Sequence, residues 1–76
     1  MLNVKIIMKD NDEDIFFENV NKISLTNGVK TENIENNDIL SNNFEYQNKT
    51  VCLQSEKQSL RIQGNDILYM VVYKMN

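Results

Sequence analysis

Few side chains in this sequence could carry out catalysis. It contains no histidine and a single cysteine, Cys52, so acid–base catalysis would have to rely on carboxylates, lysines, tyrosines or this thiol. A reactive thiol needs a neighbouring base or cation, and the flanking residues Thr50, Val51, Leu53 and Gln54 provide neither. We therefore expect no catalytic residue, and we expect that the protein is not an enzyme.

Acidic residues are concentrated in one segment near the N-terminus. Asp10, Asp12 and Asp14 have the spacing of the first ligands of an EF-hand loop. That loop also needs glycine at its sixth position and glutamate at its twelfth, where this chain has Ile15 and Asn21. We therefore expect no metal site and no cofactor. The cluster is either a solvated turn or a binding surface for a basic partner, formed by Asp10, Asp12, Glu13 and Asp14.

Positive charge is too thinly spread for direct binding of nucleic acid. Eight Lys and Arg residues stand against eleven Asp and Glu, for a net charge of -3, whereas phosphate backbones are bound by clustered cations. A small ligand is a separate alternative. Arg61, with Lys57 and Lys74 near it on one hairpin, could bind the phosphates of a cyclic or ADP-ribose-type signalling nucleotide in an oligomer that sequesters it.

The first half of the chain reads as short strands joined by turns. Apolar and polar residues alternate over residues 2–9, and the extended pattern resumes over residues 15–18, so these segments are expected to form a hairpin. The dipeptide Asn27-Gly28 predicts a type I′ turn. The strand that returns from it, residues 29–34, is poorly patterned and is expected at a sheet edge. Residues 35–43 could form a loop or a helical turn.

The second half ends in an unusually apolar strand. Residues 44–46 and 51–53 suit a hairpin, and residues 59–63 are expected to pair with residues 67–73 across a turn at Gly64-Asn65-Asp66. Residues 67–73 are apolar on both faces. Either the sheet closes over both faces, or one row is an interface with another copy or a partner. The residues expected at that interface are Leu68, Tyr69, Met70, Val71, Val72 and Tyr73.

Together these patterns predict one all-β domain over residues 1–76. We expect a small antiparallel meander of about six to eight short strands, closed as an SH3-like or OB-like barrel or packed as a β-sandwich. A domain of this size buries only about 60% of the surface of its unfolded chain, and a lone cysteine offers no disulfide, so we expect a homo-oligomer. Neither a signal peptide nor a long apolar run is evident, which leads us to expect a cytoplasmic protein without membrane contact.

The chain resembles, across its whole length, small all-β accessory proteins of bacteriophages and mobile elements. The resemblance lies in the opening strand from Val4 to Asp10, in Phe17-Glu18-Asn19-Val20 leading into Ile23, and in the stretch from Leu60 to Ile67. That group includes inhibitors of host defence, so the resemblance implies stoichiometric binding to a protein component of a bacterial defence system. The resemblance involves no diagnostic motif, so no functional residue of that group can be assigned to a position in this sequence. A structural or regulatory oligomer subunit is a further alternative.

Overall fold

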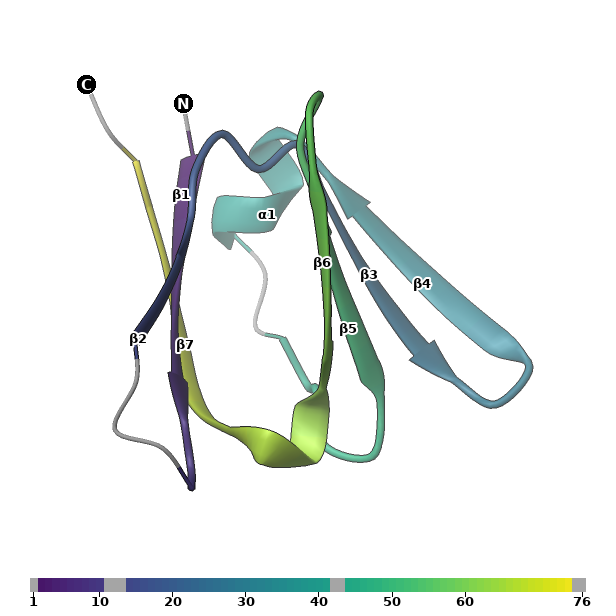
Figure 1. Cartoon of the computed structure of the whole chain (residues 1–76). Helices are drawn as coiled ribbons and strands as arrows, with labels where there is room; N and C mark the ends of the chain where they lie inside the picture. The colour runs from purple at the N-terminus through teal and green to yellow at the C-terminus, as the bar shows by residue number, and fades with distance from the viewer. Residues whose placement is uncertain (1, 11–13, 42–43, 75–76) are drawn as a thin grey trace.

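Two antiparallel sheets pack face to face in this protein. A computed structural model describes residues 2–10, 14–41 and 44–74, and seven strands lie within them. The all-β prediction and its β-sandwich alternative are confirmed (Figure 1). The first sheet has the order β2-β1-β7, and the second has the order β4-β3-β5-β6. The strands are β1 (Leu2–Met8), β2 (Asp14–Phe17), β3 (Lys22–Asn27), β4 (Lys30–Glu35), β5 (Thr50–Gln54), β6 (Ser59–Gln63) and β7 (Ile67–Lys74).

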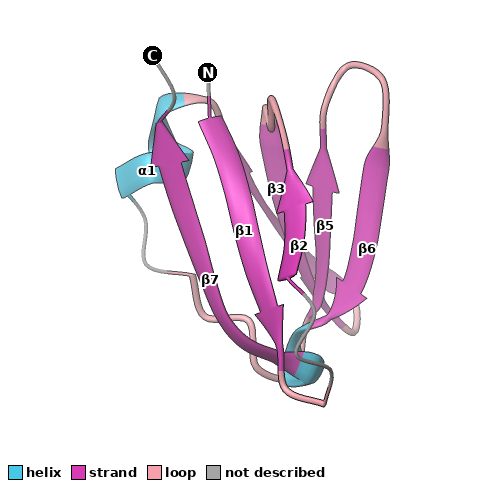
Figure 2. Ribbon diagram, turned by 60° about the vertical axis from the view of Figure 1, so that its left-hand side comes forward, coloured by secondary structure: helices cyan, strands magenta, loops and turns pink. Residues whose placement is uncertain are grey.

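The first sheet is built around β1. The predicted hairpin of β1 and β2 is confirmed, with Ile6 opposite Ile15 and Val4 opposite Phe17. The last strand, β7, pairs with the other side of β1 (Figure 2). Since successive side chains of a strand point to opposite faces, the alternation in β1 directs Val4 and Ile6 into the core, where both are completely buried.

The second sheet begins with the hairpin of β3 and β4, whose turn lies one residue later than predicted. Asn27 pairs with Lys30, so the two central turn residues are Gly28 and Val29 rather than Asn27 and Gly28. Gly28 has a φ of +63° and Val29 does not have a positive φ. This is the glycine position of a type II′ turn, not the two positive φ angles of a type I′ turn. The prediction that the returning strand lies at a sheet edge is confirmed for β4.

The predicted hairpin of residues 44–46 with residues 51–53 is wrong. Residues 44–46 form no strand, and β5 pairs instead with β3 and β6. The turn between β5 and β6 is stabilised by Ser55, whose hydroxyl oxygen accepts hydrogen bonds from the amides of Lys57 (3.3 Å) and Gln58 (3.2 Å). A serine hydroxyl thus provides the turn contact that an asparagine or aspartate side chain provides elsewhere.

The predicted hairpin of residues 59–63 with residues 67–73 is also wrong. β6 pairs with β5 in one sheet, and β7 pairs with β1 in the other. The short 3-10 helix η1 (Gly64–Asp66) connects them at one end of the sandwich (Figure 1). The amide of Gly64 donates a hydrogen bond of 2.7 Å to the carbonyl of Lys49. This contact holds the connection against the chain that leads into β5.

The core lies between the sheets and is closed on one side by a single helical turn. The segment 35–43, which the sequence left open, contains the short helix α1 (Asn37–Ser41). Its Ile39 is completely buried, and α1 contacts both β4 and β7, so it covers the gap between the sheets there (Figure 2). The buried apolar side chains are Val4, Ile6, Phe17, Val20, Ile23, Leu25, Ile34, Ile39, Val51, Leu53, Ile62 and Ile67.

Candidate functional site

The outer surface of the first sheet carries a row of large apolar side chains that face solvent. Because Val4 and Ile6 point into the core, Lys5 and Ile7 of β1 point outward. The strand register places Phe16 of β2 and Val71 of β7 on either side of Lys5, and Tyr69 beside Ile7. Tyr73 lies on the same side, opposite Asn3. We name this surface the apolar face, and its members are Ile7, Phe16, Tyr69, Val71 and Tyr73.

Three members of the apolar face are well exposed. The exposed fractions are 61% for Phe16, 46% for Tyr69 and 42% for Val71. The side chain of Leu68 is also well exposed, at 57%, and it lies at the irregularity where β7 shifts register against β1. Scattered exposed apolar residues are normal, but a contiguous group on one sheet face is typical of an interaction surface.

One ion pair lies within the apolar face. The Lys5 ammonium is 3.5 Å from the Asp14 carboxylate and 5.7 Å from the centre of the Phe16 ring. The pair therefore leaves the described part of this face without net charge around Lys5. Both side chains are about one-third to two-fifths exposed, so this pair contributes at most about 1 kcal/mol to stability.

The outer surface of the second sheet has the opposite character. There the outward side chains are polar and bond across the strands. The Ser24 hydroxyl donates to the Asn33 side chain at 2.8 Å, and the Thr26 and Thr31 hydroxyls are 3.2 Å apart. The same surface includes Arg61, which lies opposite Cys52. Cross-strand polar pairs of this kind are typical of a sheet face in contact with water.

The residues of the predicted interface strand, β7, alternate between the core and the apolar face. Met70 and Val72 lie opposite Ile6 and Val4 and pack against the core. Tyr69, Val71 and Tyr73 belong to the apolar face instead. The choice between two rows that the sequence left open is thus decided by the pairing of β7 with β1.

The predicted acidic surface is described in part. Asp10 is exposed beyond the end of β1, and Asp14 is exposed at the start of β2, so both lie at the end of the sheet where these strands are connected. Asp12 and Glu13 lie outside the described residues.

The three predicted phosphate-binding cations do not all lie on one hairpin. Arg61 lies in β6, Lys74 ends β7 in the other sheet, and Lys57 lies in the turn between β5 and β6. Their combination depended on the hairpin of residues 59–63 with residues 67–73, which the structure does not form.

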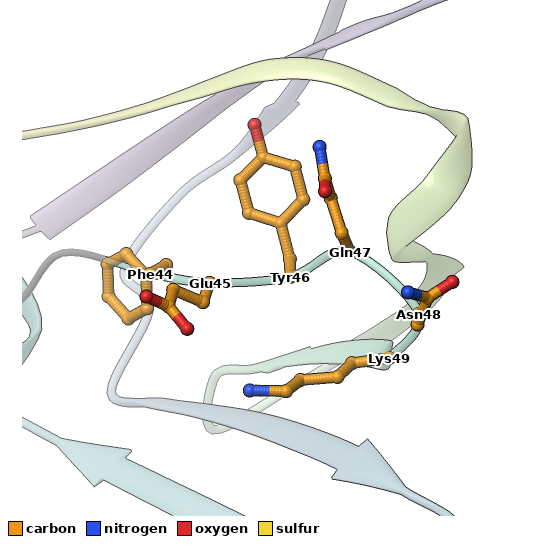
Figure 3. A pocket seen from close by; sticks show the side chains of 6 residues that line it. All are labelled: Phe44, Glu45, Tyr46, Gln47, Asn48 and Lys49. Atoms are coloured by element: carbon orange, nitrogen blue, oxygen red, sulfur yellow. The ribbon is translucent and has the colours of Figure 1, made fainter.

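Two surface hollows lie along the segment that leads from α1 to β5. One is lined by the consecutive residues 44–49, with Tyr46 and Gln47 pointing to one side of the chain and Glu45 and Lys49 to the other (Figure 3). The second is lined by apolar and aromatic residues alone, from α1, from the chain after it and from β7: Ile39, Leu40, Phe44, Tyr46, Met70, Val71 and Val72. No group of three metal-ligating side chains comes together within residues 2–10, 14–41 and 44–74.

Sequence reasoning missed Ile7 and Phe16 as surface residues. A signal for both was present. Three apolar residues in a row, Ile15 to Phe17, cannot all face one core in a strand, and neither can Ile6, Ile7 and Met8. One member of each run therefore had to face outward.

Comparison with protein-family models, with curated proteins and with solved structures found no match. Neither helix in the described part of the chain is long and apolar enough to cross a membrane.

Proposed function

We propose that this protein is a non-catalytic binding protein that contacts a protein partner through the apolar face. The contrast between the two sheet surfaces carries the proposal: one is polar and internally bonded, while the other exposes Phe16, Tyr69 and Val71. Aromatic side chains are enriched in the energetically dominant centres of protein interfaces. Lys5 is already paired with Asp14, so a partner could cover the face without leaving this cation unpartnered.

The apolar face is smaller than a standard protein–protein interface. Three strands spaced by about 4.8 Å give the face a width of about 14 Å, and the seven residues of β1 at about 3.3 Å per residue give it a length of about 23 Å, while β2 spans only four residues. A standard interface buries about 800 Å² on each partner. The partner therefore extends beyond the face onto its rim, and the turn between β1 and β2 with Asp10 and Asp14 lies there.

We further propose that the partner is a protein component of a bacterial defence system, which this protein inhibits by stoichiometric binding in the bacterial cytoplasm. The support is the resemblance to small accessory proteins of bacteriophages and the net charge of -3. An acidic rim favours encounter with the basic surface of a protein that handles nucleic acid.

The test is a phage-plating assay on strains that each carry one defined defence system. The wild-type protein is expected to restore plating on at least one strain and to copurify with a component of that system at a fixed ratio. Phe16→Glu should abolish both effects, because it places a charge in the face. Val29→Glu is the matched control, since Val29 is fully exposed at the turn between β3 and β4. The proposal is wrong if the protein restores phage plating on none of the bacterial strains. It is also wrong if the Phe16→Glu variant restores plating as well as the control variant does.

A further inference from the structure

β7 is the one outer strand in the described part of the chain that is both long and free of charge along its centre. It has eight residues, and those from Leu68 to Tyr73 are uncharged. The other outer strands differ: β2 has four residues and includes Asp14, β4 includes Lys30, Glu32 and Glu35, and β6 has five residues and includes Arg61. Short length and charge are the usual means of protecting a sheet edge from pairing with other chains. β7 is not short, and its one charged residue, Lys74, stands at its C-terminal end.

The free edge of β7 also has a hollow beside it. β7 bonds to β1 along one edge, and no described strand lies along the other. Beside that edge is the hollow lined by Ile39 and Leu40 of α1, by Phe44 and Tyr46, and by residues 70–72 of β7. α1 contacts β7, and Figure 2 places it next to one end of that strand. Main-chain groups of an edge strand specify an extended peptide, and pockets beside it select alternate side chains.

We propose that an extended segment of the partner protein adds to the first sheet as a further strand, antiparallel to β7. One row of its side chains would enter the hollow and is therefore apolar. The other row would extend the apolar face next to Tyr69, Val71 and Tyr73. This proposal depends on the proposed protein-binding function and specifies how part of the partner binds.

The charge of the protein indicates the chemistry of the occupant. The protein carries a net charge of -3, so a segment with basic residues beside its apolar ones is the complementary ligand. A second copy of this chain is a poorer occupant, because it carries the same negative net charge.

The probe is a displayed library of random decapeptides selected on the intact protein. Enriched peptides are expected to alternate apolar residues with other residues and to include basic ones. Leu40→Glu should weaken their binding by at least about tenfold, because a carboxylate would be buried against apolar groups. Val29→Glu, the same change of charge away from the hollow, should leave it unchanged. On saturation with peptide, hydrogen exchange should slow by at least about tenfold at alternate amides of β7, those that face its free edge.

Three results would overturn the strand-addition proposal. They are the enrichment of no alternating peptide, equal binding by Leu40→Glu and Val29→Glu, and β7 amides that are already protected in a dimer of the free protein. None of these results bears on the apolar face, which Phe16→Glu tests separately in the plating assay. Failure of that assay, in turn, leaves the peptide measurements intact, so the two proposals can fail independently.

Discussion

The backbone of Gly64 lies directly against the carbonyl group of Tyr46. A β-carbon at residue 64 would overlap the Tyr46 carbonyl oxygen and would lie 2.8 Å from the carbonyl oxygen of Lys49. The same region is held by Asn48 and Asn65, where the Asn48 amide donates to the Asn65 side chain at 2.7 Å and the Asn65 side chain donates back at 3.1 Å. This contact fixes the point at which the chain leaves one sheet and enters the other.

Replacement of Gly64 by alanine should therefore be strongly destabilising. We expect the free energy of unfolding to fall by at least about 1–3 kcal/mol, the usual cost of overpacking, because the obstructing atoms are backbone atoms that cannot rotate away. Gly28→Ala is the comparison. Nothing lies within 4 Å of a β-carbon there, but the φ of +63° costs an L-residue about 1–2 kcal/mol. Denaturant unfolding that shows Gly28→Ala to be the more damaging change would contradict the described packing.

The inner and outer faces of the first sheet should respond differently to substitution. Ile6 is completely buried, so Ile6→Val should lower the free energy of unfolding by about 0.5–1.5 kcal/mol. Val71 on the apolar face is 42% exposed, and Val71→Thr should change the free energy of unfolding by no more than about 0.5 kcal/mol. Chemical denaturation measures both. A loss at Val71 that matches the loss at Ile6 would mean that the apolar face is covered in the isolated protein.

Neutralising the acidic turn should slow association with the partner. Replacement of Asp10, Asp12, Glu13 and Asp14 by their amides should lower the association rate more than it raises the dissociation rate. The difference in association rate between the wild-type protein and this variant should shrink at high salt. Surface plasmon resonance at two salt concentrations measures this. The matched control removes the same charge elsewhere, at Glu18, Glu32, Glu35 and Glu56. Equal slowing by both variants would show that net charge, and not this turn, directs the encounter.

Signalling nucleotides should not stabilise the protein if its ligand is a protein. The alternative of nucleotide sequestration required Arg61 and Lys74 on one hairpin, and they lie in different sheets. We expect no change in melting temperature with cyclic or ADP-ribose-type nucleotides at millimolar concentration. A shift that Arg61→Ala removes would support sequestration instead.

Local sequence signals predicted much of the fold. The alternation in residues 2–9, the hairpin with β2, the turn near Gly28 and the edge position of β4 all depend on short-range patterns. The sequence also marked β7 as apolar on both sides. Its outward row became identifiable only from the pairing with β1, which lies at the other end of the chain.

The errors arose where distant parts of the chain decide a local structure. Gly64-Asn65-Asp66 has the composition of a hairpin turn, but contacts with Tyr46 and Lys49 make it a crossing between sheets. The true hairpin turn at Ser55 contains no glycine, asparagine or proline and depends on a serine hydroxyl. The turn composition at Gly64-Asn65-Asp66 predicts Arg61 and Lys74 on one hairpin, whereas they lie in different sheets.

The most direct test of the central claim is the dissociation constant of the complex with the defence component, measured by calorimetry for matched variants of the two sheet surfaces. Val71→Glu alters the apolar face, and Thr31→Glu alters the exposed polar surface of β4. Binding should weaken by at least about tenfold, or about 1.4 kcal/mol, for Val71→Glu and should be unchanged for Thr31→Glu. Equal affinities, with both variants folded, would contradict the assignment of the apolar face as the binding surface.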